Sequence, residues 1–420
     1  MNNHSQNMKR TLYTLICLVL SIASSMAQYQ RTLSEDIRSL QVVAGDRWMD
    51  LPIIKLNGFE QIHIDFDDMT HEYHRYVYSV EHCDANWQTS AQLFSSDFVD
   101  GFAEGNTIDD IAESVNTTFL YTHYSLTLPN SKCRLKMSGN YRVQIYDENA
   151  DNRLVAQACF MVVEPIMGIQ LEVTANTDRD IRGRHQQVAM AVSYGPLTIS
   201  NPERELTTVL MQNNRWSTAV WNARPQYIMN DGLRWEHTPE YIFDGGNEYH
   251  KFEVLDVDHT TMGLESIQWD GKYYHAFVWA DQPRYSYIYD EDANGAFYIR
   301  NSDNIENNTW SDYVYVHFQL PSPLLDGKVY LNGTWTADRL LPIYCMDYNT
   351  ETMAYEKVVL LKQGYYSYHY LWNPAGSQCE PFPTEGNFYQ TENGYQALVY
   401  YRRIGDRTDR LVGTQQVFTR

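Results

Sequence analysis

The chain has 420 residues and is strongly acidic, with 53 Asp and Glu against 32 Lys and Arg and a formal net charge of -21. Such a surface repels nucleic acid and anionic lipid headgroups, which excludes both as general partners. A mean hydropathy of -0.49 argues against a membrane-embedded helix bundle. The 33 tyrosines and 10 tryptophans favour β-sheet, and the length predicts roughly two to four domains.

Residues 1–27 have the pattern of a cleaved secretory signal peptide. Lys9 and Arg10 form a positive n-region, and Leu12 to Ile22 form an apolar stretch too short to span a bilayer. Residues 25–27 are a small-x-small cleavage site. We therefore expect an exported chain whose net charge changes from -21 to -23 when Lys9 and Arg10 are removed.

The cysteines do not indicate a lipid anchor, a zinc site or a redox motif. Cys17 lies in the apolar stretch without the small residues that precede a lipid-attachment site, so we expect no lipid anchor. The remaining five are Cys83, Cys133, Cys159, Cys345 and Cys379. Their odd number and the absence of C-x-x-C spacing speak against a zinc site or a redox motif. In an oxidising compartment Cys345 could pair with Cys379, or two of the first three could pair, and the spacing leaves this open.

The run from Tyr76 to Trp87 is the most informative stretch of the first domain. Its side chains alternate with the period of two that is typical of a strand as far as Cys83. Asp84 and Asn86 then offer short carbonyl side chains that form turns with nearby backbone amides. We expect Asp84 to bond to local backbone and Trp87 to be buried at the end of a sandwich core.

Further strands follow as far as Glu164-Pro165. The turn Ser138-Gly139-Asn140 precedes an inward row that starts at Tyr141, and this arrangement resembles the tyrosine corner of immunoglobulin-like sandwiches. We predict a first β-sandwich domain over residues 28–165.

The rest of the chain also indicates strands and turns. The polar run 301–308 lacks periodicity and is interpreted as a linker. The sequence predicts a hairpin around Gly364, and pairing of Tyr395–Tyr401 with Leu411–Val417. We predict an all-β protein of tandem immunoglobulin-like sandwiches, with a middle domain over 166–304 and a C-terminal domain over 305–420.

The run His82-Cys83-Asp84 looks catalytic at first sight. A cysteine nucleophile needs a histidine that faces it, whereas neighbours on a strand point to opposite faces. His123 could approach Cys83 from another strand, but nothing in the sequence requires it. We interpret the run as structural.

Asp290, Asp292 and Asn294 match the opening of a calcium loop, D-x-D-x-N-G, with oxygen ligands at alternate positions. The closing position holds Asn301, where a bidentate Glu is required. The same residue types form tight hairpins, so we favour a turn over a metal site. His63, His71, His74 and His250 have no partners at metal spacing, and we expect most of them to be exposed.

Aromatic residues in the last domain offer a further candidate site. Residues 365–370, with Trp335 and Trp372, could form a platform that stacks on sugars. A core face with a cross-strand tyrosine ladder is the favoured alternative. The chain contains no G-x-S-x-G, P-loop, G-x-G-x-x-G or H-E-x-x-H motif, and a glycosidase pair is defined by a separation in space that one sequence does not show. We expect no enzyme and no cofactor.

Taken together, these residues resemble the plug protein family of the Bacteroidota type IX secretion system. The resemblance runs from about Leu40 to Gly413 and rests on the order and spacing of its motifs. The motifs are His82-Cys83-Asp84-x-Asn86-Trp87, Asn116 to Tyr124, Ser138 to Tyr141, Gly245 to Glu248, Lys362 to Tyr366 around Gly364, and Tyr400 to Gly413.

The resemblance implies a non-enzymatic, periplasmic protein that does not insert into the membrane. Its partner would be the outer-membrane translocon barrel, whose periplasmic opening the family seals when no cargo occupies it. The main alternative is a secreted glycan-binding β-sandwich protein, supported by the aromatic content and by the likeness of Leu331 to Trp335 to glycogen-binding sandwiches. An outer-membrane barrel ranks third, because its last strand should end in an aromatic residue and here Arg420 follows Phe418-Thr419.

Overall fold

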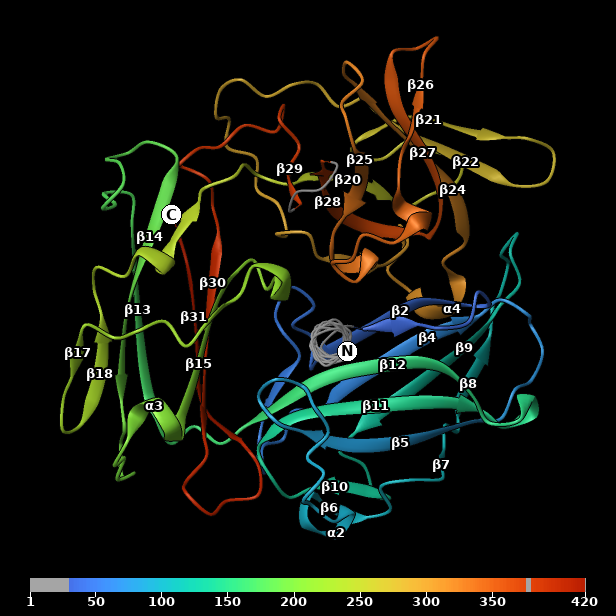
Figure 1. Cartoon of the computed structure of the whole chain (residues 1–420). Coiled ribbons are helices and arrows are strands. Elements are labelled where there is room, and N and C mark those ends of the chain that lie inside the picture. The colour runs from blue at the N-terminus through green and yellow to red at the C-terminus, as the bar shows by residue number, and fades with distance from the viewer. Residues whose placement is uncertain (1–29, 375–378, 420) are drawn as a thin grey trace, which may run out of the picture.

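The computed structural model of the chain describes residues 30–374 and 379–419, so the predicted signal peptide lies outside the described residues. Strands make up most of the regular structure and the helices are single turns (Figure 1). The sheets pair into three β-sandwich units, which confirms the predicted all-β class. Among the described residues, no helix has the length and apolar character needed to cross a membrane.

The first unit covers residues 30–165 and is a sandwich of two main sheets. One sheet has the order β1-β12-β11-β5-β7, with β3 also paired to β12: β1 (Arg31–Thr32), β3 (Ile53–Lys55), β5 (Tyr76–Cys83), β7 (Asn106–Thr107), β11 (Gly139–Asp147) and β12 (Arg153–Val163). The other has the order β2-β4-β9-β8: β2 (Ile37–Ala44), β4 (Ile62–Asp68), β8 (Asp110–Glu113) and β9 (Thr122–Leu128). A small ribbon of β6 (Val99–Gly101) and β10 (Cys133–Leu135) follows α2 (Ser95–Phe98), and the single turn η1 (Glu148–Ala150) joins β11 to β12.

Alternation along the strands builds the core of this unit. Residues on one face of β4, β5 and β11 are buried together: Ile62, Ile64, Phe66, Tyr76, Tyr78, Val80, Tyr141, Val143 and Ile145. The hydroxyl of Tyr141 donates to the carbonyl of Met137 at 2.7 Å, as in a tyrosine corner. The ring of Tyr141 also stacks on Phe160 with 5.3 Å between ring centroids.

The second unit is discontinuous in sequence. It combines residues 166–245 with residues 392–419. Its first sheet has the order β13-β14-β18-β17, with β19 on β14: β13 (Gly168–Thr174), β14 (His185–Ser193), β17 (Tyr227–Ile228), β18 (Gly232–Trp235) and β19 (Ile242–Asp244). Its second sheet has the order β16-β15-β30-β31: β15 (Leu206–Gln212), β16 (Val220–Trp221), β30 (Gly394–Tyr401) and β31 (Arg410–Phe418). Its single turns are α3 (Pro202–Glu205), η2 (Trp216–Thr218) and η3 (Pro239–Tyr241).

The third unit lies between the two parts of the second and covers residues 246–391. Strand β28 (Gly364–Asn373) pairs with β20 (His250–Val254), β23 (Phe297–Ile299), β25 (Lys328–Asn332) and β29 (Glu380–Pro381). The opposing sheet has the order β21-β22-β24-β27-β26: β21 (Leu264–Trp269), β22 (Tyr274–Val278), β24 (Tyr313–Pro321), β26 (Asp347–Asn349) and β27 (Ala354–Lys362). Its single turns are α4 (Asn307–Trp310), η4 (Thr334–Thr336) and η5 (Pro342–Tyr344).

Strand pairing does not follow the boundaries that we predicted for the later domains, 166–304 and 305–420. Strands β20 to β23 pair within the third unit, and β30, which pairs with β31 on its other side, pairs with β15 of the second. The predicted pairing of β30 with β31 is present. The predicted linker 301–308 runs into α4, where the carbonyl of Thr309 accepts from the amide of Val115 in the first unit at 2.9 Å. Periodicity identifies strands, but it carries no information on which sheet a strand joins across space.

Candidate functional site: the junction of the three units

The first and second units share an apolar core of their own. The outer face of β12 and neighbouring residues pack against β15, β30 and β31. The buried members are Ile53, Ala85, Trp87, Cys159, Met161, Val163, Val209, Met211, Leu398, Tyr400 and Leu411. Trp87 is 2% exposed, so its predicted burial is confirmed. It fills this shared core rather than the end of the first sandwich, because the turn before it carries its side chain out of that sandwich.

Polar contacts surround this shared core. One carboxylate oxygen of Asp84 accepts from Ser90 Oγ at 2.9 Å and from Thr408 Oγ1 of the second unit at 2.7 Å. The expectation that the Asp84 side chain bonds to local backbone was therefore wrong, since these partners are side chains. Asn86 does form the local turn, with Oδ1 accepting from the amide of Gln88 at 3.1 Å.

His82 is held inside the first unit next to this interface. Its Nε2 lies 3.1 Å from the carbonyl of Ser138, its Nδ1 lies 3.0 Å from Ser90 Oγ, and burial lowers its pKa. A Cβ at Gly139 would lie 2.3 Å from His82 Nε2, and Gly139 has φ of +143°, so this position requires glycine.

The geometry at Cys83 agrees with our structural interpretation of the His82-Cys83-Asp84 run. Burial raises the pKa of Cys83 to about 12, so the thiolate is not formed at neutral pH. His82 is bonded to Ser90 and Ser138, and Nδ1 of His123 lies 2.7 Å from Asp67. The arrangement therefore lacks both an ionised nucleophile and a histidine bonded to it.

Among the described residues no disulfide joins the five cysteines, and three of them are buried: Cys83, Cys133 and Cys159. We predict that a thiol reagent modifies the exposed Cys379 of the folded mature chain quickly and the three buried cysteines only after unfolding. Thiol titration before and after adding guanidinium measures this directly. Cys379→Ser should remove the fast phase, and fast modification of Cys83 would contradict its assignment to the core.

The first and third units are joined by a buried ion pair. Lys362 Nζ lies 2.6 Å from Asp67 Oδ2, and both side chains are 1% exposed. The hydroxyl of Tyr313 donates to the same carboxylate oxygen at 2.7 Å, and His123 Nδ1 lies 2.7 Å from the other. Burial alone would raise the pKa of Asp67, but Lys362 and His123 outweigh it and hold that pKa below its ordinary value.

Aromatic rings and backbone groups complete this contact. Lys362 Nζ lies 4.1 Å from the ring centroid of Tyr121, a cation–π geometry. Asp312 of the third unit accepts from the amide and the hydroxyl of Thr118 in the first unit, each at 2.7 Å. The buried charges are thus paired and hydrogen-bonded, the condition under which such groups are tolerated in an interior.

The second and third units are joined by two chain crossings that bond to each other. Asn247 Nδ2 donates to the carbonyl of Glu385 at 2.7 Å, and the amide of Phe388 donates to the carbonyl of Gly246 at 2.7 Å. These bonds tie together the two ends of the third unit, and Asn387 Nδ2 of that unit donates to Asp244 Oδ1 of the second unit at 2.7 Å.

A cluster of charged side chains lies beside these crossings. His250 Nδ1 is 2.8 Å from Asp281 Oδ1, its Nε2 is 3.0 Å from Glu385 Oε2, and Arg284 pairs with Glu385. Burial would lower the pKa of His250, but the two carboxylates outweigh it and raise that pKa to about 9. His250 and Arg284 lower the pKa of Glu385 to about 2. The side chain of His250 is 12% exposed, and His63, His71 and His74 are also partly buried, so the expectation that most of these four histidines are exposed was wrong.

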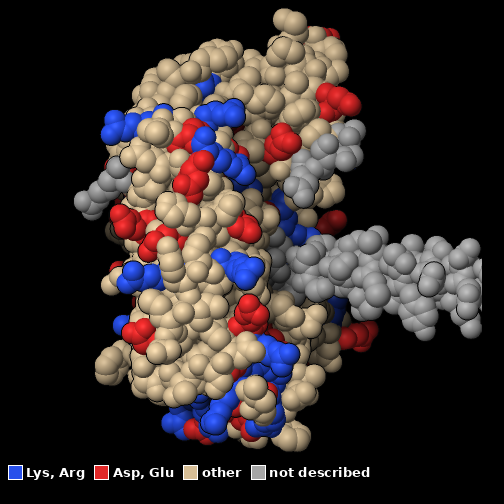
Figure 2. Space-filling view, turned by 60° about the vertical axis from the view of Figure 1, so that its left-hand side comes forward, with Lys and Arg blue, Asp and Glu red and all other residues tan. Residues whose placement is uncertain are grey.

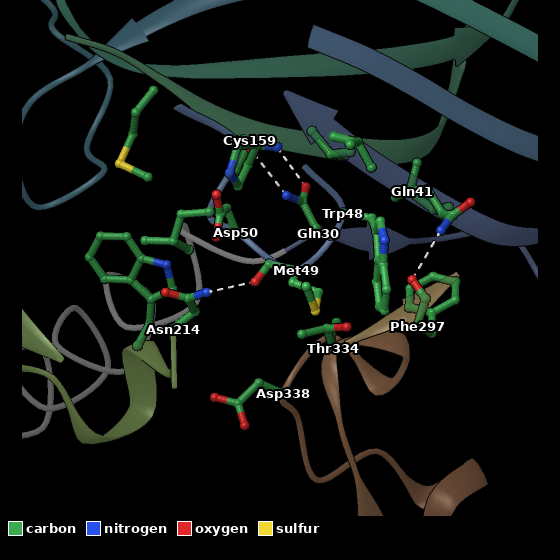
Figure 3. Close-up of a pocket in the computed structure, with 18 of the residues that line it drawn as sticks. Gln30, Gln41, Trp48, Met49, Asp50, Cys159, Asn214, Phe297, Thr334 and Asp338 are labelled. Atoms are coloured by element: carbon green, nitrogen blue, oxygen red, sulfur yellow. Dashed lines mark hydrogen bonds between the residues drawn. The ribbon is translucent and has the colours of Figure 1, made fainter. Parts of the chain in front are cut away.

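All three units meet around a cavity of about 130 Å³ (Figure 3). Its wall includes Trp48, Met49, Trp87, Trp216, Phe297 and Asp338. Gln30 closes one side through a paired contact with the backbone of Cys159, at 2.8 and 2.6 Å (Figure 3). Asn214 of the second unit donates to the carbonyl of Met49 at 3.1 Å.

Aromatic and charged groups of the cavity wall also bridge units. Trp48 stacks on Tyr298 of the third unit with 5.4 Å between ring centroids. Arg215 Nε of the second unit pairs with Asp338 Oδ1 of the third unit at 3.3 Å. The cavity wall thus holds the units together, and it contains no arrangement of nucleophile and base.

The candidate calcium residues are occupied by the protein itself. Asp290 pairs with Lys251 Nζ at 2.5 Å, and the carboxylate of Asp292 accepts from the amides of Tyr249 and Asn294. Burial raises the pKa of Asp292 to about 7. The segment is a loop before β23 rather than the tight hairpin that we considered. Within the described residues, no group of three or more His, Cys, Asp or Glu is placed to hold a metal ion.

We predict that calcium does not stabilise the fold, because binding would have to displace Lys251 from Asp290 and two amides from Asp292. Addition of millimolar calcium or of a chelator should change the melting temperature by less than about 1 °C, since only a ligand of the native state raises it. A saturable rise that disappears in Asp292→Asn would contradict this.

The tyrosine-rich segment 365–370 is core rather than a sugar platform. Tyr366, Tyr368 and Tyr370 are each at most 2% exposed and belong to the core of the third unit. The hairpin that we predicted around Gly364 is absent, because β27 and β28 follow each other in the chain but pair in opposing sheets. A Cβ at Gly364 would lie 2.3 Å from the carbonyl oxygen of Tyr298. Only glycine allows the two backbones to approach so closely.

Sequence reasoning missed the residues that lock the units together. Asp67, Lys362, Arg215 and Asp338 make contacts between units that no local motif indicates. The sequence did contain an indication for Asp67 and Lys362. Each is a charged residue at or near the end of a strand with several apolar residues. The partners are 295 positions apart in sequence, so no local pattern connects them.

The chain is similar to a known protein family in its first unit and to a solved structure over most of its length. Residues 37–164 match the model for the first domain of the type 9 secretion system plug protein. The crystal structure of a hypothetical protein from Parabacteroides merdae ATCC 43184 is similar over 94% of this chain and 100% of that chain, with 40% sequence identity and a TM-score of 0.90. No curated protein sequence matches the chain.

The matched residues coincide with the first sandwich unit and include the run from His82 to Trp87. The similarity to the Parabacteroides protein extends over the second and third units as well. The family is one of secretion plug domains and not an enzyme family, and it indicates an extracytoplasmic role associated with type IX secretion. The chain belongs to the type 9 secretion system plug protein family.

Proposed function

We propose that this protein binds the periplasmic opening of the outer-membrane translocon barrel of the type IX secretion system and seals it when no cargo occupies it. Family membership, carried by the match over residues 37–164, is the observation on which the proposal rests. The predicted signal peptide over residues 1–27 supports export of the chain. We propose no catalytic activity.

The way the three units are joined supports a sealing role. Each pair of units has its own contact: the apolar core around Trp87 for the first and second, the Asp67–Lys362 ion pair for the first and third, and the Arg215–Asp338 pair for the second and third. Three contacts arranged in a closed triangle prevent any unit from rotating without breaking two of them. A protein that closes a wide pore needs both area and such rigidity.

Purification of the tagged chain from solubilised envelopes tests the proposal. We expect a very large outer-membrane barrel protein to co-purify, and deletion of the gene should let a large hydrophilic antibiotic enter the cell. A tagged periplasmic protein of similar charge serves as the control for non-specific recovery. Binding to glycan arrays without any membrane partner would contradict the proposal and favour the glycan-binding alternative.

A further inference from the structure

A groove follows the seam between the first and third units. It adjoins the junction cavity, with which it shares Gln30, Leu40 and Phe297, and has a volume of about 600 Å³. The first unit contributes residues 30–40 to one wall. The third unit contributes the other wall, largely from residues 334–344.

The charge of this groove is opposite to that of the molecule. Its charged residues are Arg31, Arg38, Arg339 and one acidic residue, Glu35. The whole chain has 53 acidic against 32 basic residues, and on the face shown in Figure 2 the two signs are interspersed. A positive groove on an acidic molecule attracts anionic groups to that place and repels them elsewhere.

Apolar side chains line the groove beside the arginines. The third unit presents Trp335, Leu341, Ile343, Tyr344 and Leu360. Ile343 is 46% exposed, and Leu33 on the opposite wall is 48% exposed. Exposed apolar groups next to guanidinium groups favour a ligand that carries both carboxylates and apolar side chains, because each kind of group then finds its partner.

Strand β2 forms part of the groove wall and lies at the end of its sheet. It pairs with β4 on one side, and the register is irregular between Arg38 and Gln41, where Ser39 has φ of +50°. Residues 37–43 of this strand line the groove and the adjoining cavity. An edge strand is the element to which extended peptides add.

From these features we propose that the groove binds an extended peptide segment of a partner protein that alternates carboxylate and apolar side chains. The carboxylates pair with Arg31, Arg38 and Arg339, and the apolar side chains cover the wall around Trp335 and Ile343. This inference rests on the proposed function when the partner is taken to be the translocon, whose periplasmic side would supply the segment.

Peptide binding to the mature chain, residues 28–420, tests the groove directly. The probes are a fluorescent twelve-residue peptide alternating Glu with Leu or Phe, its Lys-for-Glu counterpart and its Ser-for-Leu/Phe counterpart. We expect the acidic apolar peptide to bind at micromolar concentration and the other two at least tenfold more weakly. Equal binding of the acidic and basic peptides, or no binding up to millimolar concentration, would overturn the proposal.

Charge reversal locates the binding. Arg38→Glu/Arg339→Glu should weaken binding of the acidic peptide at least a hundredfold, about tenfold for each arginine–carboxylate pair that the substitutions remove. The matched control Arg179→Glu/Arg224→Glu changes the net charge equally at two exposed positions of the second unit and should weaken binding less than threefold. Arg38→Gln/Arg339→Gln provides a second test if the reversed variant does not fold. Similar weakening in groove and control variants would overturn the proposal.

Co-purification with the groove variant and binding to lipid vesicles distinguish failure of this inference from failure of the proposed function. If the translocon co-purifies with wild type and equally with the folded groove variant, the groove is not its docking site and the proposed function stands. If it co-purifies with neither, the proposed function fails and the peptide result alone decides the groove. Binding to phosphatidylglycerol vesicles without peptide binding would assign the arginines to a lipid surface and overturn the proposal.

Discussion

Replacement of Lys362 by methionine should lower the free energy of unfolding by about 3–5 kcal/mol, because it leaves Asp67 buried without its main counter-charge. Both side chains are 1% exposed and the two atoms are 2.6 Å apart, so water does not replace the missing ammonium group. Urea denaturation of the mature chain at pH 7 measures the change. Adding Asp67→Asn to Lys362→Met should recover much of the stability, since the uncompensated charge is then removed.

The exposed pair Lys132–Asp109 provides the matched control. Its atoms are also 2.6 Å apart, but the two side chains are 46% and 67% exposed. Lys132→Met should cost less than about 1 kcal/mol, because water solvates the remaining carboxylate. If Lys362→Met costs as little as Lys132→Met, the first and third units are not held together by this pair.

The His250 cluster should make the stability of the protein depend on pH. The folded-state pKa of His250 is raised to about 9 from an ordinary value of 6.5, so its contribution is complete below pH 6.5 and is lost as the pH rises through 9. The pKa of Glu385 is lowered to about 2 from 4.5, so its contribution is complete above pH 4.5 and is lost as the pH falls through 2. The cluster therefore stabilises the protein most between pH 4.5 and pH 6.5, where both contributions are complete.

Comparison of wild type with His250→Gln isolates this effect. The stability difference between them should shrink by about 3 kcal/mol between pH 6 and pH 9, which follows from the shift of the His250 pKa. Denaturant unfolding at several pH values measures the difference. His237, whose side chain is 72% exposed and pairs with Asp178, is the matched control, and His237→Gln should show no such trend. A constant difference for His250→Gln would contradict the assigned charge state.

Much of the fold could be predicted from local pattern. The alternation from Tyr76 to Cys83 predicted β5, and the charged and small residues around Gly405 predicted the turn that joins β30 to β31. These features depend on a few neighbouring residues, which a sequence displays directly. The burial of Trp87 could also be predicted, because a large aromatic residue after a turn needs apolar surroundings.

The junction could not be predicted, because its contacts are made between distant segments. The side chain of Asp84 suits a local turn as well as a contact with another unit, and the sequence does not distinguish these two roles. The partner Thr408 lies 324 positions later. The same limit explains why the sequence predicts β30 and β31 in the last domain, since the pairing of β30 with β15 joins segments almost half of the chain apart.

The discontinuity of the second unit has a consequence for biosynthesis. The chain is made from its N-terminus, so the whole third unit is synthesised between β15 and β30. Strand β15 therefore lacks its central neighbour in the sheet until β30 has been made. Until then the apolar face around Trp87 on the finished first unit also lacks its cover. Strands β30 and β31, which are made last, therefore complete the packing of two cores. Until they are made, the nascent protein exposes apolar surface and is prone to aggregate.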